Sequence, residues 1–162
     1  MVVPRRSPRV WSLAVALAAL LAIAAGVAAQ TFTATVVRVV DGDTIWVTLG
    51  GHAEKVRYIG MDTPETHHPT RGEEPGGREA TLVNRRLVEQ KTVRLELDVR
   101  HRDRYGRLLA YVYVGETMIN AELVRLGYAQ VMTVPPNVKY ATLFVNLQRE
   151  AREAGRGLWA SR

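Results

Sequence analysis

Runs of alternating apolar and polar residues follow one another along the chain and predict β-strands. β-Branched residues dominate the first two runs, which are separated by the turn residues Asp41-Gly42-Asp43. Gly50-Gly51 supplies a second turn, so the first three runs predict a meander. The five predicted strands cover residues 31–40, 44–49, 55–60, 92–98 and 108–114.

Three longer stretches place apolar residues at helical spacing. In the first, Ala80, Val83 and Leu87 share one face, and the other two stretches stop at Gly127 and Gly155. The three predicted helices cover residues 78–90, 118–126 and 140–154.

The segment 62–77, between the third strand and the first helix, is rich in proline and glycine and predicts a long loop. Loops of this length are usually functional or disordered. His67 and His68 lie in it, and together with His52 they match no zinc-binding spacing. We therefore expect ordinary loop histidines here.

Five strands and three helices that do not alternate regularly predict one α+β domain, mainly β, in about 130 residues. A small barrel fits this order of elements. No internal repeat and no linker divides residues 31–162.

Much of the net positive charge of the chain lies in its first 29 residues. Twenty-two Lys and Arg against 16 Asp and Glu give a net charge of +6, which favours a polyanionic partner such as nucleic acid. Three of the 22 lie in residues 1–29, which leaves 19 against 16 in the rest. The absence of cysteine excludes disulfides, cysteine-ligated zinc, iron–sulfur clusters and thiol catalysis.

Residues 1–29 predict a signal peptide. Three arginines precede an apolar run that ends in Val27-Ala28-Ala29, small residues after which a signal peptidase cuts. Because the run is mostly alanine, we expect cleavage and a secreted or periplasmic domain of residues 30–162. The alternative is a membrane anchor, since residues 11–29 are nearly long enough to form a spanning helix.

Four short segments carry candidate chemistry. Each alone is typical of a hairpin turn, a helix cap or a strand connection. The segments are Asp-Gly-Asp-Thr at 41–44, Val56-Arg57, Asp-Thr-Pro-Glu-Thr at 62–66 and Asp-Arg-Tyr-Gly-Arg at 103–107.

In this order and spacing the four segments resemble the staphylococcal nuclease-like, or thermonuclease, family of phosphodiesterases. The resemblance covers roughly residues 33–160 and includes the helix at 119–127 and the closing Gly157-Leu158-Trp159. It implies an OB-fold, a five-stranded β-barrel that carries three α-helices. The strand and helix count above agrees with this fold.

The resemblance also implies catalytic residues. Arg57 and Arg107 match the two catalytic arginines of the family. A planar guanidinium group grips phosphate oxygens through two parallel hydrogen bonds, where lysine offers a point charge. Glu65 matches the proposed general base, which either takes a proton from the attacking water or orients that water.

Metal ligands are implied in the same way. Asp43 and Asp62 match the metal-binding carboxylates, and the residue at the position of Thr63 contributes a backbone carbonyl in the family. All-oxygen ligation of this kind suits Ca²⁺, with Mg²⁺ as the second choice. Asp41 lies beside these residues and is expected to support them.

Substrate contacts are implied at two places. Tyr105 and Arg104 match positions that stack on a base and touch a phosphate, although Tyr105 also fits a turn tyrosine packed over the barrel. After Gly127, Thr133 and Pro135 stand where other family members place tyrosines against the nucleotide. We therefore expect the affinity and base preference to differ from theirs.

Together these residues predict an exported, Ca²⁺-dependent nuclease that hydrolyses phosphodiester bonds in DNA, with RNA as a second candidate substrate. Low sequence specificity is expected because an OB-type groove contacts the backbone and stacks bases. The resemblance implies 3′-phosphate ends, and we expect a monomer. The alternative is a nucleic-acid-binding module on the same fold without activity.

Overall fold

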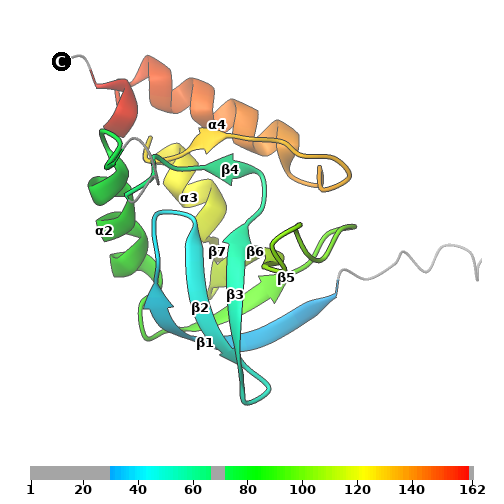
Figure 1. Cartoon of the computed structure of the whole chain (residues 1–162). Helices are drawn as coiled ribbons and strands as arrows, with labels where there is room; N and C mark the ends of the chain where they lie inside the picture. Colours follow the sequence, from blue (N-terminus) through cyan, green and yellow to red (C-terminus); the bar gives the residue numbers. More distant parts are fainter. Residues whose placement is uncertain (1–29, 67–71, 161–162) are drawn as a thin grey trace, which may run out of the picture.

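Five strands close into a barrel in the computed structural model, which describes residues 30–66 and 72–160 (Figure 1). Neighbouring strands pair antiparallel in the order β3-β2-β1-β5-β6, and a parallel pairing of β3 with β6 completes the ring. The barrel strands are β1 (Thr31–Val39), β2 (Thr44–Leu49), β3 (His52–Tyr58), β5 (Thr92–Glu96) and β6 (Leu108–Val114). This architecture confirms the predicted five-stranded OB-type barrel.

The third strand begins earlier than predicted, at His52 instead of residue 55, and ends at Tyr58. Gly50 and Gly51 both have positive φ, 57° and 83°, which is the backbone of a two-residue hairpin turn. Such a turn pairs the residues on either side of it, and Leu49 is paired with His52. The turn therefore extends the strand into polar sequence that lacks alternation.

Three two-residue strands were not predicted. β4 (Met61–Asp62) pairs with β8 (Gln130–Val131), and β7 (Thr117–Met118) pairs with the end of β6. Two residues are too few for alternation to be recognised.

The three predicted helices are present with ends shifted by one or two residues, and a short 3₁₀ helix follows them. They are α2 (Gly77–Val88), α3 (Ile119–Arg125), α4 (Ala141–Glu153) and η1 (Gly157–Trp159). α3 packs against both α2 and α4, so the helices lie together on one side of the barrel (Figure 1). Within residues 30–66 and 72–160, no helix is long and apolar enough to span a bilayer.

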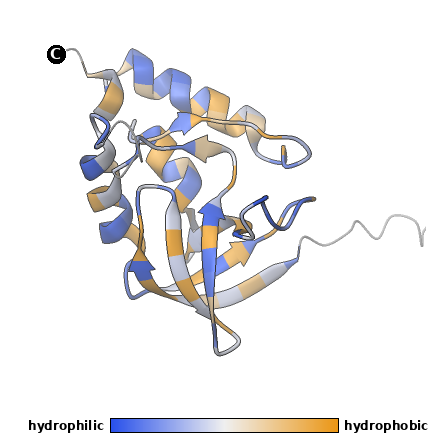
Figure 2. Cartoon of the chain, in the orientation of Figure 1, coloured by the Kyte–Doolittle hydropathy of each residue, from blue (hydrophilic) through white to orange (hydrophobic). Residues whose placement is uncertain are grey.

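Alternation along the strands builds the core (Figure 2). The inward side chains Ile45, Val47 and Val56 are fully buried, and Ile119 and Leu123 of α3 pack against the same cluster. Two expectations fall outside the described residues, namely the signal peptide or anchor at 1–29 and the loop histidines at 67 and 68.

A buried amide ties α3 to the barrel closure. Asn120 is fully buried, its Nδ2 donates to the carbonyl of Ile59 at 2.9 Å, and its Oδ1 accepts from the amide of Val112 at 2.9 Å. These bonds satisfy backbone groups just past β3 and within β6. Asn120 therefore supports the place where the barrel closes.

A second polar cluster lies where α4 begins. Glu96 at the end of β5 is 6% exposed and accepts hydrogen bonds from Nζ of Lys139 at 2.7 Å and from the hydroxyl of Tyr140 at 3.0 Å. Burial disfavours the carboxylate, but these hydrogen bonds outweigh it and lower the pKa of Glu96. The cluster anchors the segment before α4 to the sheet.

Replacing Asn120 with alanine is expected to reduce the free energy of unfolding by about 2–3 kcal/mol, because it leaves buried backbone groups without partners. Urea unfolding followed by circular dichroism measures this loss. Asn146→Ala, at a half-buried position of α4, is the matched control and should cost much less. Equal losses in the two variants would contradict the role given to Asn120.

Glu96→Gln should lower the free energy of unfolding at neutral pH and lose this effect in acid. The pKa of Glu96 is lower in the folded than in the unfolded protein, so the stabilisation is complete above the unfolded value, about 4.5, and is lost as the pH falls through the folded pKa. Urea unfolding of both proteins between pH 7 and pH 3 tests this. Glu116 lies on an exposed turn, so the difference in free energy of unfolding between Glu116→Gln and wild type should not change with pH.

Candidate active site

The closure of the barrel brings two arginines that are distant in sequence to the same end of it. Arg57 lies in β3 and is paired in parallel register with Leu109 of β6. Arg107 immediately precedes β6, and its charge acts on the guanidinium of Arg57. The two predicted catalytic arginines therefore share one site.

Arg57 is buried between two carboxylates. One Nη group forms an ion pair with Asp43, and the other lies 2.5 Å from Oδ1 of Asp62. Asp43 is buried with Arg57, whereas the side chain of Asp62 is half exposed. Burial lowers the pKa of Arg57, and the charges of Asp62 and Asp41 oppose this shift.

Asp43 connects the β1–β2 turn to the segment after β4. Its Oδ2 accepts from the amide and the hydroxyl of Thr63 at 3.0 and 3.1 Å, and its Oδ1 accepts from the hydroxyl of Thr44 at 2.9 Å. Gly42 fits closely here, since a Cβ at this position would lie 2.6 Å from Oγ1 of Thr63. The predicted ligands Asp43, Asp62 and Thr63 are thus held as one unit.

A residue of α2 that sequence analysis missed supports this turn from behind. Asn84 is fully buried, and its Nδ2 donates to the carbonyl of Asp41 at 3.0 Å. Its Oδ1 accepts from the hydroxyl of Tyr58 at 2.9 Å. The sequence offered one indication of this role, because Asn84 is a polar residue on the inward face of a predicted amphipathic helix.

Glu65 is exposed at the rim of the same group. Its amide donates to Oε2 of Glu74 at 3.1 Å, and its carbonyl accepts from the amide of Glu74 at 2.8 Å. At Gly77, where α2 starts, a Cβ would lie 2.8 Å from the carbonyl oxygen of Glu65. Partial burial raises the pKa of Glu65, the charge of Asp41 adds to this, and Arg57 opposes it. The charges of Asp41 and Arg57 therefore act on Glu65.

Arg107 is held by its own loop. Its Nε donates to Oδ2 of Asp103 at 2.6 Å, and its amide donates to Oδ1 of the same residue at 3.0 Å. Its Nη groups make no hydrogen bond to other residues within 30–66 and 72–160. Asp103 thus fixes the direction of a guanidinium whose outer edge is available to an anion.

The predicted substrate residues Arg104 and Tyr105 lie beside Arg107. Tyr105 is 68% exposed, Arg104 donates to its hydroxyl at 2.6 Å, and the guanidinium of Arg107 lies 5.5 Å from its ring centre. Tyr105 is therefore exposed on the loop instead of being packed over the barrel.

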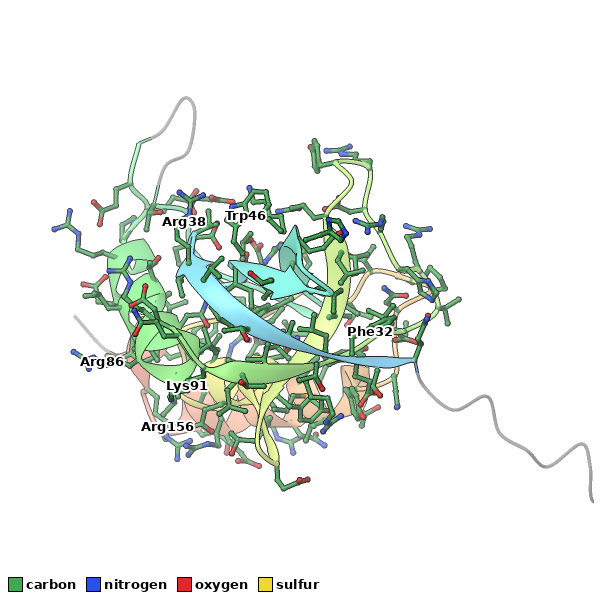
Figure 3. All side chains as sticks on the ribbon, turned by 90° about the horizontal axis from the view of Figure 1, so that it is seen from below. Phe32, Arg38, Trp46, Arg86, Lys91 and Arg156 are labelled. Carbon is green, nitrogen blue, oxygen red and sulfur yellow. The ribbon has the colours of Figure 1, made fainter. Side chains whose placement is uncertain are left out.

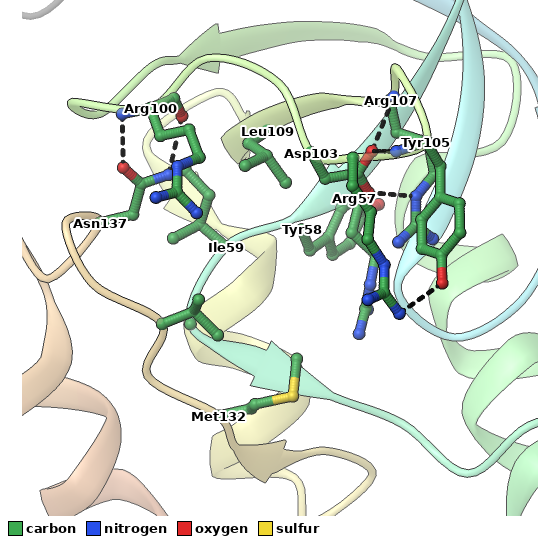
Figure 4. Close-up of a pocket in the computed structure, with 13 residues that line it drawn as sticks. Arg57, Tyr58, Ile59, Arg100, Asp103, Tyr105, Arg107, Leu109, Met132 and Asn137 are labelled. Atoms are coloured by element: carbon green, nitrogen blue, oxygen red, sulfur yellow. Dashed lines mark hydrogen bonds and ion pairs between the residues drawn. The ribbon is translucent and has the colours of Figure 1, made fainter.

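A pocket of about 370 Å³ begins at these arginines (Figure 4). Apolar side chains form much of its lining, among them Ile59, Leu109, Met132 and Val134. Arg57, Arg107 and Tyr105 line one end, and Arg100 and Asn137 line the other. Arg104, which also lines the pocket, donates a hydrogen bond to Tyr105.

Asp43, Asp62 and Thr63 are the predicted donors for a cation. No group of three or more His, Cys, Asp and Glu suited to a metal is found in residues 30–66 and 72–160. Asp43 and Asp62 nevertheless converge on one positive group, Arg57, and Thr63 is bonded to Asp43. Two carboxylates and a backbone carbonyl are hard oxygen donors, so this set fits Ca²⁺ in its chemistry.

The chain is similar in sequence to proteins of one known family. The family model described as Staphylococcal nuclease homologue matches residues 55–161. The chain is 40% identical over 129 residues to Thermonuclease of Staphylococcus hyicus, which covers 80% of this chain and 76% of that protein. It is 42% identical over 122 residues to Thermonuclease of Staphylococcus intermedius, covering 75% and 73%. It is also 41% identical over 128 residues to Endonuclease YncB of Bacillus subtilis, covering 78% and 61%.

Both the family match and identities near 40% over most of the chain support one conclusion. The protein belongs to the staphylococcal nuclease family.

Proposed function

We propose that this protein is a nuclease that hydrolyses phosphodiester bonds in nucleic acid and uses Ca²⁺. The observation that carries the proposal is the convergence of Arg57 and Arg107 at one pocket, next to Glu65 and to the paired carboxylates Asp43 and Asp62. Relatives named thermonuclease and endonuclease support the same class of reaction.

The arginines supply positive charge where the reaction develops negative charge. Attack by water on a phosphodiester places additional charge on the non-bridging oxygens, and fixed cations stabilise it. Arg57 is fixed by its two carboxylates, and Arg107 is fixed by Asp103. Because both guanidinium groups are already oriented, little reorganisation is needed when substrate binds.

Glu65 is the candidate for activating the water. Its raised pKa makes it a better proton acceptor than an ordinary glutamate. Its backbone is held against Glu74 and the start of α2, which restricts where the carboxylate reaches. In this role Glu65 takes a proton from water, and the leaving oxygen accepts a proton from solvent.

The cation belongs with the two carboxylates. Asp43, Asp62 and the carbonyl of Thr63 would hold Ca²⁺, which supplies further positive charge to the phosphate. Asp41 and Asn84 support the turn that carries Asp43.

The finer features of the function are proposed on the sequence. The pattern of residues 1–29 supports export with cleavage after Ala29, and N-terminal sequencing of the exported protein distinguishes this from a membrane tether. The resemblance to thermonucleases supports 3′-phosphate ends. The apolar pocket supports low sequence specificity toward DNA and RNA, because aliphatic side chains contact all bases alike.

Arg107→Lys should lower kcat by about 10²- to 10³-fold, because a point charge replaces an oriented fork of donors. The measurement is hydrolysis of single-stranded DNA at saturating Ca²⁺, with circular dichroism to verify the fold. Arg86→Lys on α2, outside the pocket, is the control and should keep full activity. Glu65→Gln should show a loss of at least similar size, and full activity in both site variants would contradict the assignment.

Removing Ca²⁺ with a chelator should abolish cleavage, and adding it back should restore cleavage. Asp62→Asn should raise the Ca²⁺ concentration needed for half-maximal activity, because one carboxylate ligand becomes a neutral amide. Titration calorimetry with Ca²⁺ alone gives the affinity independently of activity. Cleavage without any divalent cation would refute the metal role, and salt-sensitive DNA binding without cleavage would identify a binding module instead.

A further inference from the structure

Arg100 lies at the end of the pocket opposite the catalytic arginines. Figure 4 shows it beside Asn137, with Leu109 and Ile59 between it and the group formed by Arg57, Arg107 and Tyr105. Its guanidinium makes no hydrogen bond and no ion pair with the residues the structure describes, 30–66 and 72–160.

This lack of a partner distinguishes Arg100 from its neighbours. Arg102 on the same loop is paired with Glu54 at 2.9 Å, and Arg107 is paired with Asp103 at 2.6 Å. Surface arginines without a partner occur elsewhere in the chain, so a second feature is needed to indicate a function.

That feature is the way the backbone of Arg100 is held. Its amide donates to Oδ1 of Asn137 at 2.7 Å, and its carbonyl accepts from Nδ2 of Asn137 at 2.8 Å. Asn137 is 5% exposed, so both polar atoms of a buried amide are used to position one residue of a surface loop. The origin of the Arg100 side chain is therefore fixed relative to the pocket.

A second hydrogen bond holds the same loop beside this clamp. The amide of Lys139 donates to Oδ2 of Asp98 at 3.2 Å, so residues 98 and 139 are joined as residues 100 and 137 are. The backbone that carries Arg100 is therefore fixed at two neighbouring places.

We propose that Arg100, at the far end of the pocket, binds the phosphate of the nucleotide that flanks the one in the pocket. The proposal rests on the nuclease function proposed above. A strand that passes from the catalytic arginines along the apolar pocket reaches Arg100 next. The charge of Arg100 is complementary to a phosphate.

The experiment compares a long and a minimal substrate. Arg100→Ala should lower kcat/KM on a single-stranded oligonucleotide by about tenfold, since a hydrogen bond between charged groups is lost. On a nitrophenyl phosphodiester of a single nucleoside, which has no flanking nucleotide, kcat/KM should change less than twofold, because the chemistry is untouched. Arg100→Lys should recover most of the loss, because a phosphate accepts a point charge.

Equilibrium binding of the oligonucleotide gives a second readout. For Arg100→Ala the slope of log affinity against log salt should be smaller by about 0.7, the value for one phosphate contact on a single strand. Arg86→Ala on α2 removes the same charge at a position away from the pocket and should leave both readouts unchanged (Figure 3).

Three results would overturn the proposal. Equal losses on the two substrates would place Arg100 in catalysis itself, and no loss on either would remove it from the substrate path. If the loss of activity in Arg100→Ala depends on which base flanks the cleaved bond, and Arg100→Lys does not restore activity, then Arg100 contacts a base edge and not a phosphate. If wild type cleaves neither substrate, the nuclease proposal fails, while the salt slope still tests the phosphate contact.

Discussion

The parallel pairing of β3 with β6 is the constraint on which the rest of the structure depends. It closes the barrel, and it places Arg57 beside the strand that Arg107 introduces. The other pairings between barrel strands are antiparallel. β3 pairs with β2 inside the meander, and its pairing with β6 joins it to the second half of the chain. A buried amide, Asn120, serves the backbone next to this closure. Fold and site are therefore stabilised by the same contacts.

Concentrating cations at one end of a barrel has an electrostatic cost, and the structure offsets it with acids placed behind the arginines. Asp43 and Asp62 hold Arg57 from one side, and Asp103 holds Arg107. Each pair keeps a guanidinium oriented, so these ion pairs contribute to the geometry of the site. The acids of the turn are in turn held by Thr63 and by Asn84, so the orientation of the arginines extends back to α2.

Elements that repeat a period over several residues could be predicted from the sequence, and single contacts could not. The five barrel strands and three helices each carry enough alternating or helical positions to be recognised, whereas two-residue strands such as β4 and β8 exist because tertiary packing brings them together. The charged site residues were recognisable because their types and spacing match a family. The asparagines at 84, 120 and 137 were not, since nothing local marks which carbonyl or amide a buried amide will meet.

The lining of the pocket by Met132 and Val134 depends on the length of the segment that carries them. In an extended segment alternate side chains face the same way, so the residues between them point elsewhere. The far side of this segment is secured where Asn137 joins the neighbouring loop. Inserting or deleting one residue between Gln130 and that anchor would therefore exchange the inward side chains for the outward ones, whereas a single substitution changes only one of them.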